Sequence, residues 1–143
     1  MSLKLAFGEG DASYKAAGEL AGITALVDDF YAVMDTEPHA AVIRAMHPGD
    51  LSSSGQRLSY FLSGWLGGPR LYREHFGAIS IPDIHKHLRI GSEERDQWLW
   101  CMQRALDRQD YPPEFKEYLL AQLSIPAERV RQRSQLEHAA KSG

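Results

Sequence analysis

Several features that would assign the chain to a special class are missing from this sequence. Cys101 is the only cysteine, so no disulfide can form within the chain, which fits a reducing compartment. No apolar run approaches the roughly 20 residues that cross a bilayer, and residues 1–10 lack the pattern of a secretory signal. The formal net charge of −3 comes without a basic run, which argues against nucleic acid and anionic membranes as partners. We therefore expect a cytoplasmic protein that binds neither nucleic acid nor membrane.

The composition that is present belongs to an ordinary globular protein. Of the 143 residues, 43% are hydrophobic and 24% are charged, enough for one core that encloses one cofactor. Neither an internal repeat nor a linker divides the chain. We expect a single domain over residues 1–143, with flexible ends at 1–10 and 139–143.

Apolar residues recur at intervals of three and four, which predicts helices rather than strands. Glycines and prolines mark where these helices should break. The expected helices are, in chain order, a short one around Tyr14 that ends at Gly18, one over 20–35, a short one from Pro38 that stops before Pro48, one after the capping residues 50–54, a turn at 71–76, one over 92–109 with Ser92 as its cap, and a long one from 112 that Pro126 should kink or divide.

Three motifs in a fixed order carry a resemblance to a known family. LVDDFY at 26–31 is followed by GGP at 67–69 and then by ERDQWL at 94–99. In this order the motifs resemble those of the group II truncated haemoglobins, which occur mostly in bacteria and plants. The resemblance covers most of the chain, from about residue 14 to residue 123.

This resemblance implies an all-α fold, the truncated globin fold, in which a two-over-two helical sandwich surrounds haem. It also implies haem b (iron protoporphyrin IX), held by one histidine, so that a penta-coordinate iron keeps its sixth position for a gas. A haem pocket needs an apolar box around the porphyrin, and cationic or hydroxyl groups at the rim for the two propionates.

The iron ligand has to be chosen between His85 and His87. In the family this histidine lies five residues before an isoleucine that corresponds to Ile90 here, which favours His85 as the metal ligand. Two positions apart on a helix, side chains point about 200° apart, so both rings cannot face one iron. His87 would then face solvent or a propionate. Without the flanking motifs, both residues would be interpreted as ordinary loop histidines.

The segment around these histidines departs from the family pattern. The family's basic residues before the histidine and its PF pair after it are absent, and Leu88 is expected to pack beneath the porphyrin instead. Arg57 matches a family position that neutralises a propionate. Tyr72 is a weaker candidate for this role, as are Lys86 and Arg89, which fit ordinary solvated residues better.

On the opposite face of the haem, Tyr31 and Trp98 match the family's ligand-facing residues. A tyrosine hydroxyl and an indole N–H are both hydrogen-bond donors. A charge-assisted hydrogen bond is worth roughly 1.5–3 kcal/mol, so such donors should slow gas release by about one to two decades. His47 falls where the family has an aromatic residue or a histidine. It is expected to add a third donor through water, or to bind the iron when no gas is present, with a surface histidine as the alternative.

Small and apolar residues complete the expected pocket. Ser54 matches a gating position and is small enough to leave the gate open. Leu58 and Phe61 should form the apolar floor. Phe30 is expected at the back wall and Met102 at the proximal wall. All four apolar residues would also serve as core in a protein without haem.

The expected function is that of a haem-binding globin that binds O₂, NO or CO. Strong hydrogen bonds to the gas imply slow release, which favours O₂/NO redox chemistry over oxygen transport. NO detoxification by an NO dioxygenase reaction is preferred to a peroxidase-like reaction and to ligand storage or sensing. Redox chemistry needs an electron donor, which the sequence does not identify, and the choice between monomer and homodimer stays open.

The alternative from another class is a helical binding or regulatory module without haem. In one variant of it, His75, His85 and His87 would bind zinc or a similar ion. The spacing is poor for such a site, because Asp83 is the one carboxylate in the same short segment. A red protein with an intense Soret band would separate the two hypotheses.

Overall fold

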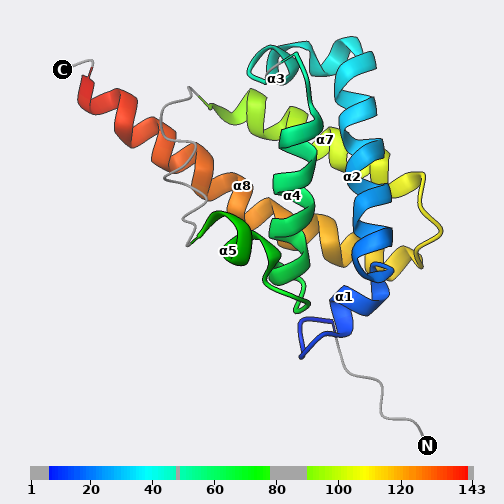
Figure 1. Cartoon of the computed structure of the whole chain (residues 1–143). Helices are drawn as coiled ribbons and strands as arrows, with labels where there is room; N and C mark the ends of the chain where they lie inside the picture. Colours follow the sequence, from blue (N-terminus) through cyan, green and yellow to red (C-terminus); the bar gives the residue numbers. More distant parts are fainter. Residues whose placement is uncertain (1–6, 48, 78–89, 142–143) are drawn as a thin grey trace, which may run out of the picture.

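A computed structural model describes residues 7–47, 49–77 and 90–141, with side chains placed as far as residue 136. These residues form helices and turns without any strand, so the all-α prediction is confirmed (Figure 1). In chain order the helices are α1 (Ala12–Ala16), α2 (Glu19–Thr36), the 3₁₀ helix η1 (Pro38–Ala40), α3 (Ala41–Ala45), α4 (Ser52–Trp65), α5 (Leu71–Phe76), α7 (Ser92–Asp107) and α8 (Pro113–Lys141).

Two pairs of helices make up the body of the molecule. In Figure 1, α2 and α4 run antiparallel beside each other, and α7 and α8 form a second antiparallel pair that crosses behind them. α2 contacts both α4 and α7, so it connects the two layers, while the short α5 packs against α4. This arrangement is the two-over-two sandwich expected from the sequence.

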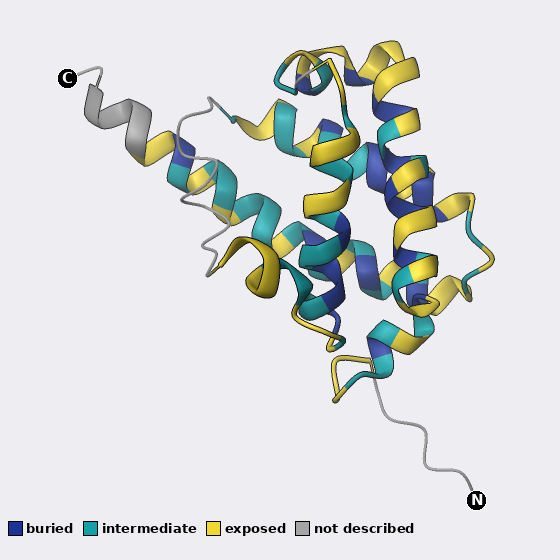
Figure 2. Ribbon diagram, viewed as in Figure 1, coloured by how far each residue is buried: buried dark blue, intermediate teal, exposed yellow. Residues whose placement is uncertain are grey.

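The core lies between the layers, where the apolar faces of four helices meet (Figure 2). On α2 the buried residues recur every three or four positions, the period of a helix with one buried face. α4 buries Leu62 together with the small Ser59 and Ser63. The largest fully buried side chains are those of Phe30, Phe115, Ile23, Leu26, Met34, Leu62, Met102, Leu106, Leu119, Leu123, Val27 and Val33.

The GGP turn after α4 packs directly against the N-terminal segment. Gly67 has a φ of +95°, and a Cβ atom there would lie 2.0 Å from the carbonyl oxygen of Gly10. A Cβ atom on Gly68 would lie 2.3 Å from the ring of Tyr14, whose backbone N–H donates to the carbonyl oxygen of Leu66 over 3.0 Å. Both glycines are therefore required for this close approach, which holds the end of α4 against α1.

The start of α7 differs by one residue from the predicted start. Gly91 occupies the capping position that the sequence predicts for Ser92, and Ser92 is the first helical residue. The carboxylate of Glu94 accepts a hydrogen bond from the N–H of Gly91 over 2.9 Å. An acid in the first turn thus satisfies the N–H that precedes the helix, so a serine cap is not needed.

α8 runs through Pro126 without being divided there. Proline removes one backbone hydrogen bond from a helix interior, so the residues beyond it depend more on tertiary support. Two residues in this second half, Glu128 and Ser134, contact the start of α7. A division of the last helix at Pro126 is therefore wrong, because side chains hold the second half against its neighbour.

Candidate functional site

Rings from α2, α7 and the chain after α3 form a continuous cluster, which we call the ring cluster. The ring centroids of Phe30 and Tyr31 are 4.9 Å apart, and those of Phe30 and Trp98 are 5.1 Å apart. His47 extends the cluster beyond Tyr31, at a centroid distance of 5.9 Å. Two of the residues predicted to face a gas ligand, Tyr31 and Trp98, thus pack on the fully buried Phe30, and the third, His47, joins them through Tyr31.

The Tyr31 hydroxyl in this cluster has one weak contact. Its oxygen lies 3.5 Å from the carbonyl oxygen of Ser54, in the first turn of α4, beyond the usual range of hydrogen bonds. Burial raises the pKa of Tyr31 above its ordinary value, so the hydroxyl keeps its proton throughout the neutral range. Tyr31 is therefore a donor whose proton is only weakly engaged, and Ser54 contributes a backbone oxygen to the cluster.

His47 is held in one tautomer by the backbone of α3. Its Nδ1 atom lies 2.7 Å from the carbonyl oxygen of Ile43. A carbonyl oxygen can only accept, so Nδ1 carries the proton in this hydrogen bond. In the neutral ring Nε2 is then a lone-pair acceptor, which differs from the donor role expected from the sequence.

Trp98 is half-buried on α7, where its ring packs against Phe30. Within the described part of the chain, its indole N–H donates to no other residue. An indole N–H is a donor only, and a buried one usually finds an acceptor. Trp98 therefore adds a second donor to the ring cluster, and no acceptor for it lies among the described residues.

The four apolar residues that are predicted to line a haem pocket fall into two groups. Leu58 and Phe61 are half-buried on α4, and Phe61 stacks on Trp65 with centroids 6.1 Å apart. Phe30 and Met102 are fully buried in the core. Leu58 and Phe61 therefore keep part of their surface exposed, whereas Phe30 and Met102 belong to the core.

The two described candidates for a propionate both contact Phe76, at the end of α5. The guanidinium of Arg57 lies 4.5 Å from the centre of the Phe76 ring, a cation–π contact. The ring of Tyr72 is 5.0 Å from the same ring. Phe76, which is 38% exposed, therefore connects Arg57 and Tyr72 by contacting both, although no sequence motif singles it out. The one available signal is its spacing of four residues from Tyr72 on a helix.

The predicted iron ligand lies outside the described residues. This holds for His85, for its alternative His87 and for the expected porphyrin contact Leu88. The weaker propionate candidates Lys86 and Arg89 lie outside them as well. These predictions rest on the sequence alone.

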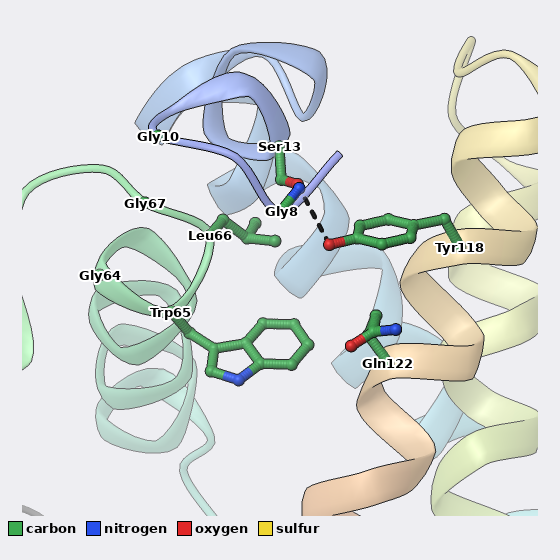
Figure 3. Close-up of a pocket in the computed structure, with 9 residues that line it drawn as sticks. All are labelled: Gly8, Gly10, Ser13, Gly64, Trp65, Leu66, Gly67, Tyr118 and Gln122. Carbon is green, nitrogen blue, oxygen red and sulfur yellow. Dashed lines mark hydrogen bonds between the residues drawn. The ribbon is translucent and has the colours of Figure 1, made fainter. Parts of the chain in front are cut away.

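A pocket of about 210 Å³, which sequence reasoning missed, lies at the opposite end of α4 from the ring cluster (Figure 3). Ser13 lies at its rim, where its hydroxyl accepts from the N–H of Gly8 over 2.9 Å and donates to the Tyr118 hydroxyl over 3.4 Å. The N-terminal segment, the end of α4 with the GGP turn, and α8 together enclose this space, so no local motif could reveal it. The lining residues are Gly8, Gly10, Ser13, Gly64, Trp65, Leu66, Gly67, Tyr118 and Gln122.

The described residues offer no competing metal site. Among them, no group of three or more histidine, cysteine or acidic residues could hold an ion. His75 instead packs against the ring of Tyr60, with centroids 5.0 Å apart. Burial raises the pKa of the Cys101 thiol to about 11, so it stays uncharged and unreactive at neutral pH. Over the same ranges, no helix is both long and apolar enough to cross a membrane.

The chemistry of the ring cluster fits haem. A haem pocket combines apolar contact surface with a few polar groups that face the ligand side of the iron. Leu58 and Phe61 supply apolar surface on α4, and the ring cluster supplies two weakly engaged donors and one acceptor nitrogen. The remaining requirement is an imidazole for the iron, and the residue that the sequence predicts for it, His85, lies outside the described residues.

Known proteins show the same sequence pattern and fold. Residues 12–132 match the bacterial-like globin family. The group 2 truncated hemoglobin YjbI of Bacillus subtilis (strain 168) is 32% identical over 127 residues, which cover 89% of this chain and 93% of that protein. The group II 2-on-2 hemoglobin from the plant pathogen Agrobacterium tumefaciens is 37% identical with a TM-score of 0.81, covering 92% of this chain and 98% of that one. The truncated oxygen-avid haemoglobin from Bacillus subtilis is 31% identical with a TM-score of 0.76, covering 82% and 97%.

These matches span the ring cluster, both helical layers and the segment that contains His85. Globins of this family bind haem, which agrees with the chemistry of the cluster. The family match ends at residue 132, before the end of α8. The chain therefore belongs to the bacterial-like globin family, within which it is a group II truncated haemoglobin.

Proposed function

We propose that the ring cluster holds a diatomic gas on haem b, whose otherwise penta-coordinate iron is bound by His85. Haem supplies an iron atom that takes up O₂, NO or CO and exchanges electrons with it. The observation that carries the proposal is the pair of weakly engaged donors, Tyr31 and Trp98, in one cluster of packed rings. The proposed compartment is the cytoplasm, because a lone buried thiol fits a reducing environment.

Tyr31, Trp98 and His47 would have different roles in holding the gas. Tyr31 and Trp98 donate to the gas from rings that Phe30 already holds in place, so little reorganisation is needed. Because Tyr31 stays protonated, it donates throughout the neutral range. His47 accepts at Nε2, and it therefore orients the Tyr31 hydroxyl or a water molecule rather than donating to the gas.

Slow release of the gas favours its consumption over its transport. A charge-assisted hydrogen bond is worth roughly 1.5–3 kcal/mol, which slows release by about one to two decades. The similar protein from Bacillus subtilis is described as oxygen-avid. We favour O₂-dependent oxidation of NO, a detoxifying reaction that consumes electrons from a separate donor.

Substitution of the two donors tests the proposal. In Tyr31→Phe and Trp98→Phe we expect O₂ to dissociate about ten- to a hundredfold faster than from the unsubstituted protein, because each change removes one hydrogen bond. Stopped-flow mixing of the protein under O₂ with NO, followed by nitrate analysis, measures the reaction itself. Tyr60→Phe is the matched control, since Tyr60 lies on α4 and bonds Gln56 instead. Unchanged O₂ release in both test variants would contradict the proposal.

A peroxidase-like reaction is the second candidate, and the tautomer of His47 favours it. Reduction of H₂O₂ begins with the transfer of a proton from the peroxide to a nearby base. His47 offers a lone pair at Nε2 beside Tyr31 for this proton. Tyr31 and Trp98 would hold the peroxide while the proton moves.

A further inference from the structure

Among the α-helices in the described part of the chain, α5 alone buries none of its residues. Figure 2 shows most of this helix as exposed, although it packs against α4. Rings make that contact: His75 packs against Tyr60 with centroids 5.0 Å apart, and Phe76 lies under the guanidinium of Arg57. α5 is therefore attached through a few ring contacts and keeps much of its surface in contact with solvent.

Three arginines accompany the exposed ring of Phe76, and we call these four residues the arginine patch. Arg57 contacts the ring directly, 4.5 Å from its centre. Arg73 precedes Phe76 by three residues, and Arg70 precedes Arg73 by three, so they follow one side of α5 and the turn before it. All four side chains are exposed.

The arginine patch is positively charged in a chain whose formal net charge is −3. Among the described residues, none of its three guanidiniums forms an ion pair with an acidic side chain. Glu74 is the one acid on α5. Arginine and aromatic side chains are the types enriched where proteins bind one another, and a positive surface attracts an acidic one. The patch therefore fits a protein partner with an acidic face.

We propose that the arginine patch is the docking surface of the electron donor, a protein with an acidic face. This inference rests on the proposed function, in which the reaction consumes electrons from a separate donor. One electron passes from the donor to the iron, so the donor is oxidised, ferric iron becomes ferrous, and no covalent bond forms or breaks. Such encounters need only a small contact, below about 1,200 Å² of buried surface.

The patch adjoins the residues that are predicted to meet the haem edge. Arg57 and Tyr72 are the described candidates for a propionate, and both contact Phe76. A donor seated on the patch would thus approach the haem from its propionate side. Arg70 and Arg73 have no predicted contact with haem, so their charges are left to attract the donor.

The test measures how fast reduced flavodoxin, a small acidic electron-transfer protein, reduces the haem-loaded ferric protein. In the double variant Arg70→Gln with Arg73→Gln, the second-order rate constant at low ionic strength should fall about tenfold, because complementary charge speeds the encounter by about ten- to a thousandfold. In about 1 M salt, which screens charges beyond about 3 Å, the difference should disappear. The dissociation constant of oxidised flavodoxin, measured by calorimetry at low salt, should rise in the same variant.

The matched control is the double variant Arg104→Gln with Arg129→Gln. It makes the same change in net charge at exposed positions on α7 and α8, and it should keep the rate and the affinity of the unsubstituted protein. Equal effects in the two double variants would overturn the inference, because net charge rather than the patch would then act. It would also be overturned if the patch variant alone lost binding to phosphatidylserine vesicles while its reaction with flavodoxin stayed unchanged.

Two further measurements separate docking from the chemistry of the haem. Dithionite, a small reductant, should reduce all variants at the same rate in about 1 M salt, and a slower rate in the patch variant would overturn the inference. The single reaction of the O₂-loaded protein with NO needs no donor. Its failure contradicts the proposed function, whereas a normal reaction with NO and equal flavodoxin rates in all variants contradict the docking surface alone.

Discussion

At the scale of single residues, the most informative contact is the hydrogen bond between His47 Nδ1 and the Ile43 carbonyl oxygen, at 2.7 Å. It makes Nδ1 the donor and leaves Nε2 with a lone pair. A ring fixed in this way can take up a proton without first changing its orientation. This property distinguishes His47 from Tyr31 and Trp98, which are donors.

Replacement of His47 by leucine should slow the reaction with H₂O₂ by about a hundredfold or more, the usual contribution of a positioned general base. The measurement is the stopped-flow rate at which the ferric protein's Soret band changes on mixing with H₂O₂. His39→Leu is the matched control, because His39 packs against Trp100 outside the ring cluster, with centroids 4.5 Å apart. A wild-type rate in His47→Leu would show that His47 takes no proton from the peroxide.

The sequence singles out residues that the structure brings together, but it does not predict the chemistry of each one. Tyr31 and Trp98 are found through motifs, and the structure brings their rings to the same side chain, Phe30. The acceptor role of His47 depends on a carbonyl oxygen of α3, and no side-chain pattern encodes that contact. Phe76 likewise gains its place under Arg57 through the packing of α5 on α4.

At the scale of helices, the attachment of α8 to α7 has a defined pH dependence. Hydrogen bonds from Arg131 and then from Arg95 lower the pKa of Glu128 from its ordinary value of 4.5 to about 2. A carboxyl whose pKa is lowered by folding contributes stability above its unfolded pKa and loses this contribution as the pH falls through its folded pKa. The contribution of Glu128 should therefore be complete above about pH 4.5 and vanish towards pH 2.

Urea unfolding of the protein and of Glu128→Gln at several pH values checks this expectation. The free energy of unfolding of Glu128→Gln should be lower than that of the unsubstituted protein at neutral pH. The difference should shrink between pH 4.5 and pH 2, because protonation removes the charge that the substitution removes permanently. Glu117→Gln is the control on the same helix, at an exposed position. A difference that stays constant with pH would mean that the carboxylate's charge is unimportant for this attachment.

The sequence predicts where the helices lie more accurately than it predicts how they begin or where they break. The apolar spacing on 20–35 predicts α2 to within one residue at each end, because one helical face must be buried. Predictions of helix caps and helix breaks from the local sequence fail where other side chains supply the hydrogen bonds or contacts that the backbone needs. Glu94 makes a serine cap unnecessary at α7, and contacts from Glu128 and Ser134 keep α8 helical beyond Pro126.

At the scale of the whole molecule, haem should contribute a large part of the stability. Free hemin at about a hundred times its dissociation constant would stabilise the folded chain by about 2.7 kcal/mol, a rise in melting temperature on the order of 10 °C. Thermal unfolding of the haem-free protein with and without added hemin measures this rise. His85→Ala should lose most of the rise and His87→Ala should keep it. The reverse pattern would make His87 the iron ligand.

The proline within α8 also has a consequence for motion. Without an N–H at Pro126, the carbonyl of Gln122, four residues earlier, loses its usual helical partner. Amide exchange in the last helix can therefore begin at its middle, close to the pocket that Gln122 lines, as well as at its free end. The helix stays continuous through residue 126, and its second half depends on the contacts of Glu128 and Ser134 with the start of α7.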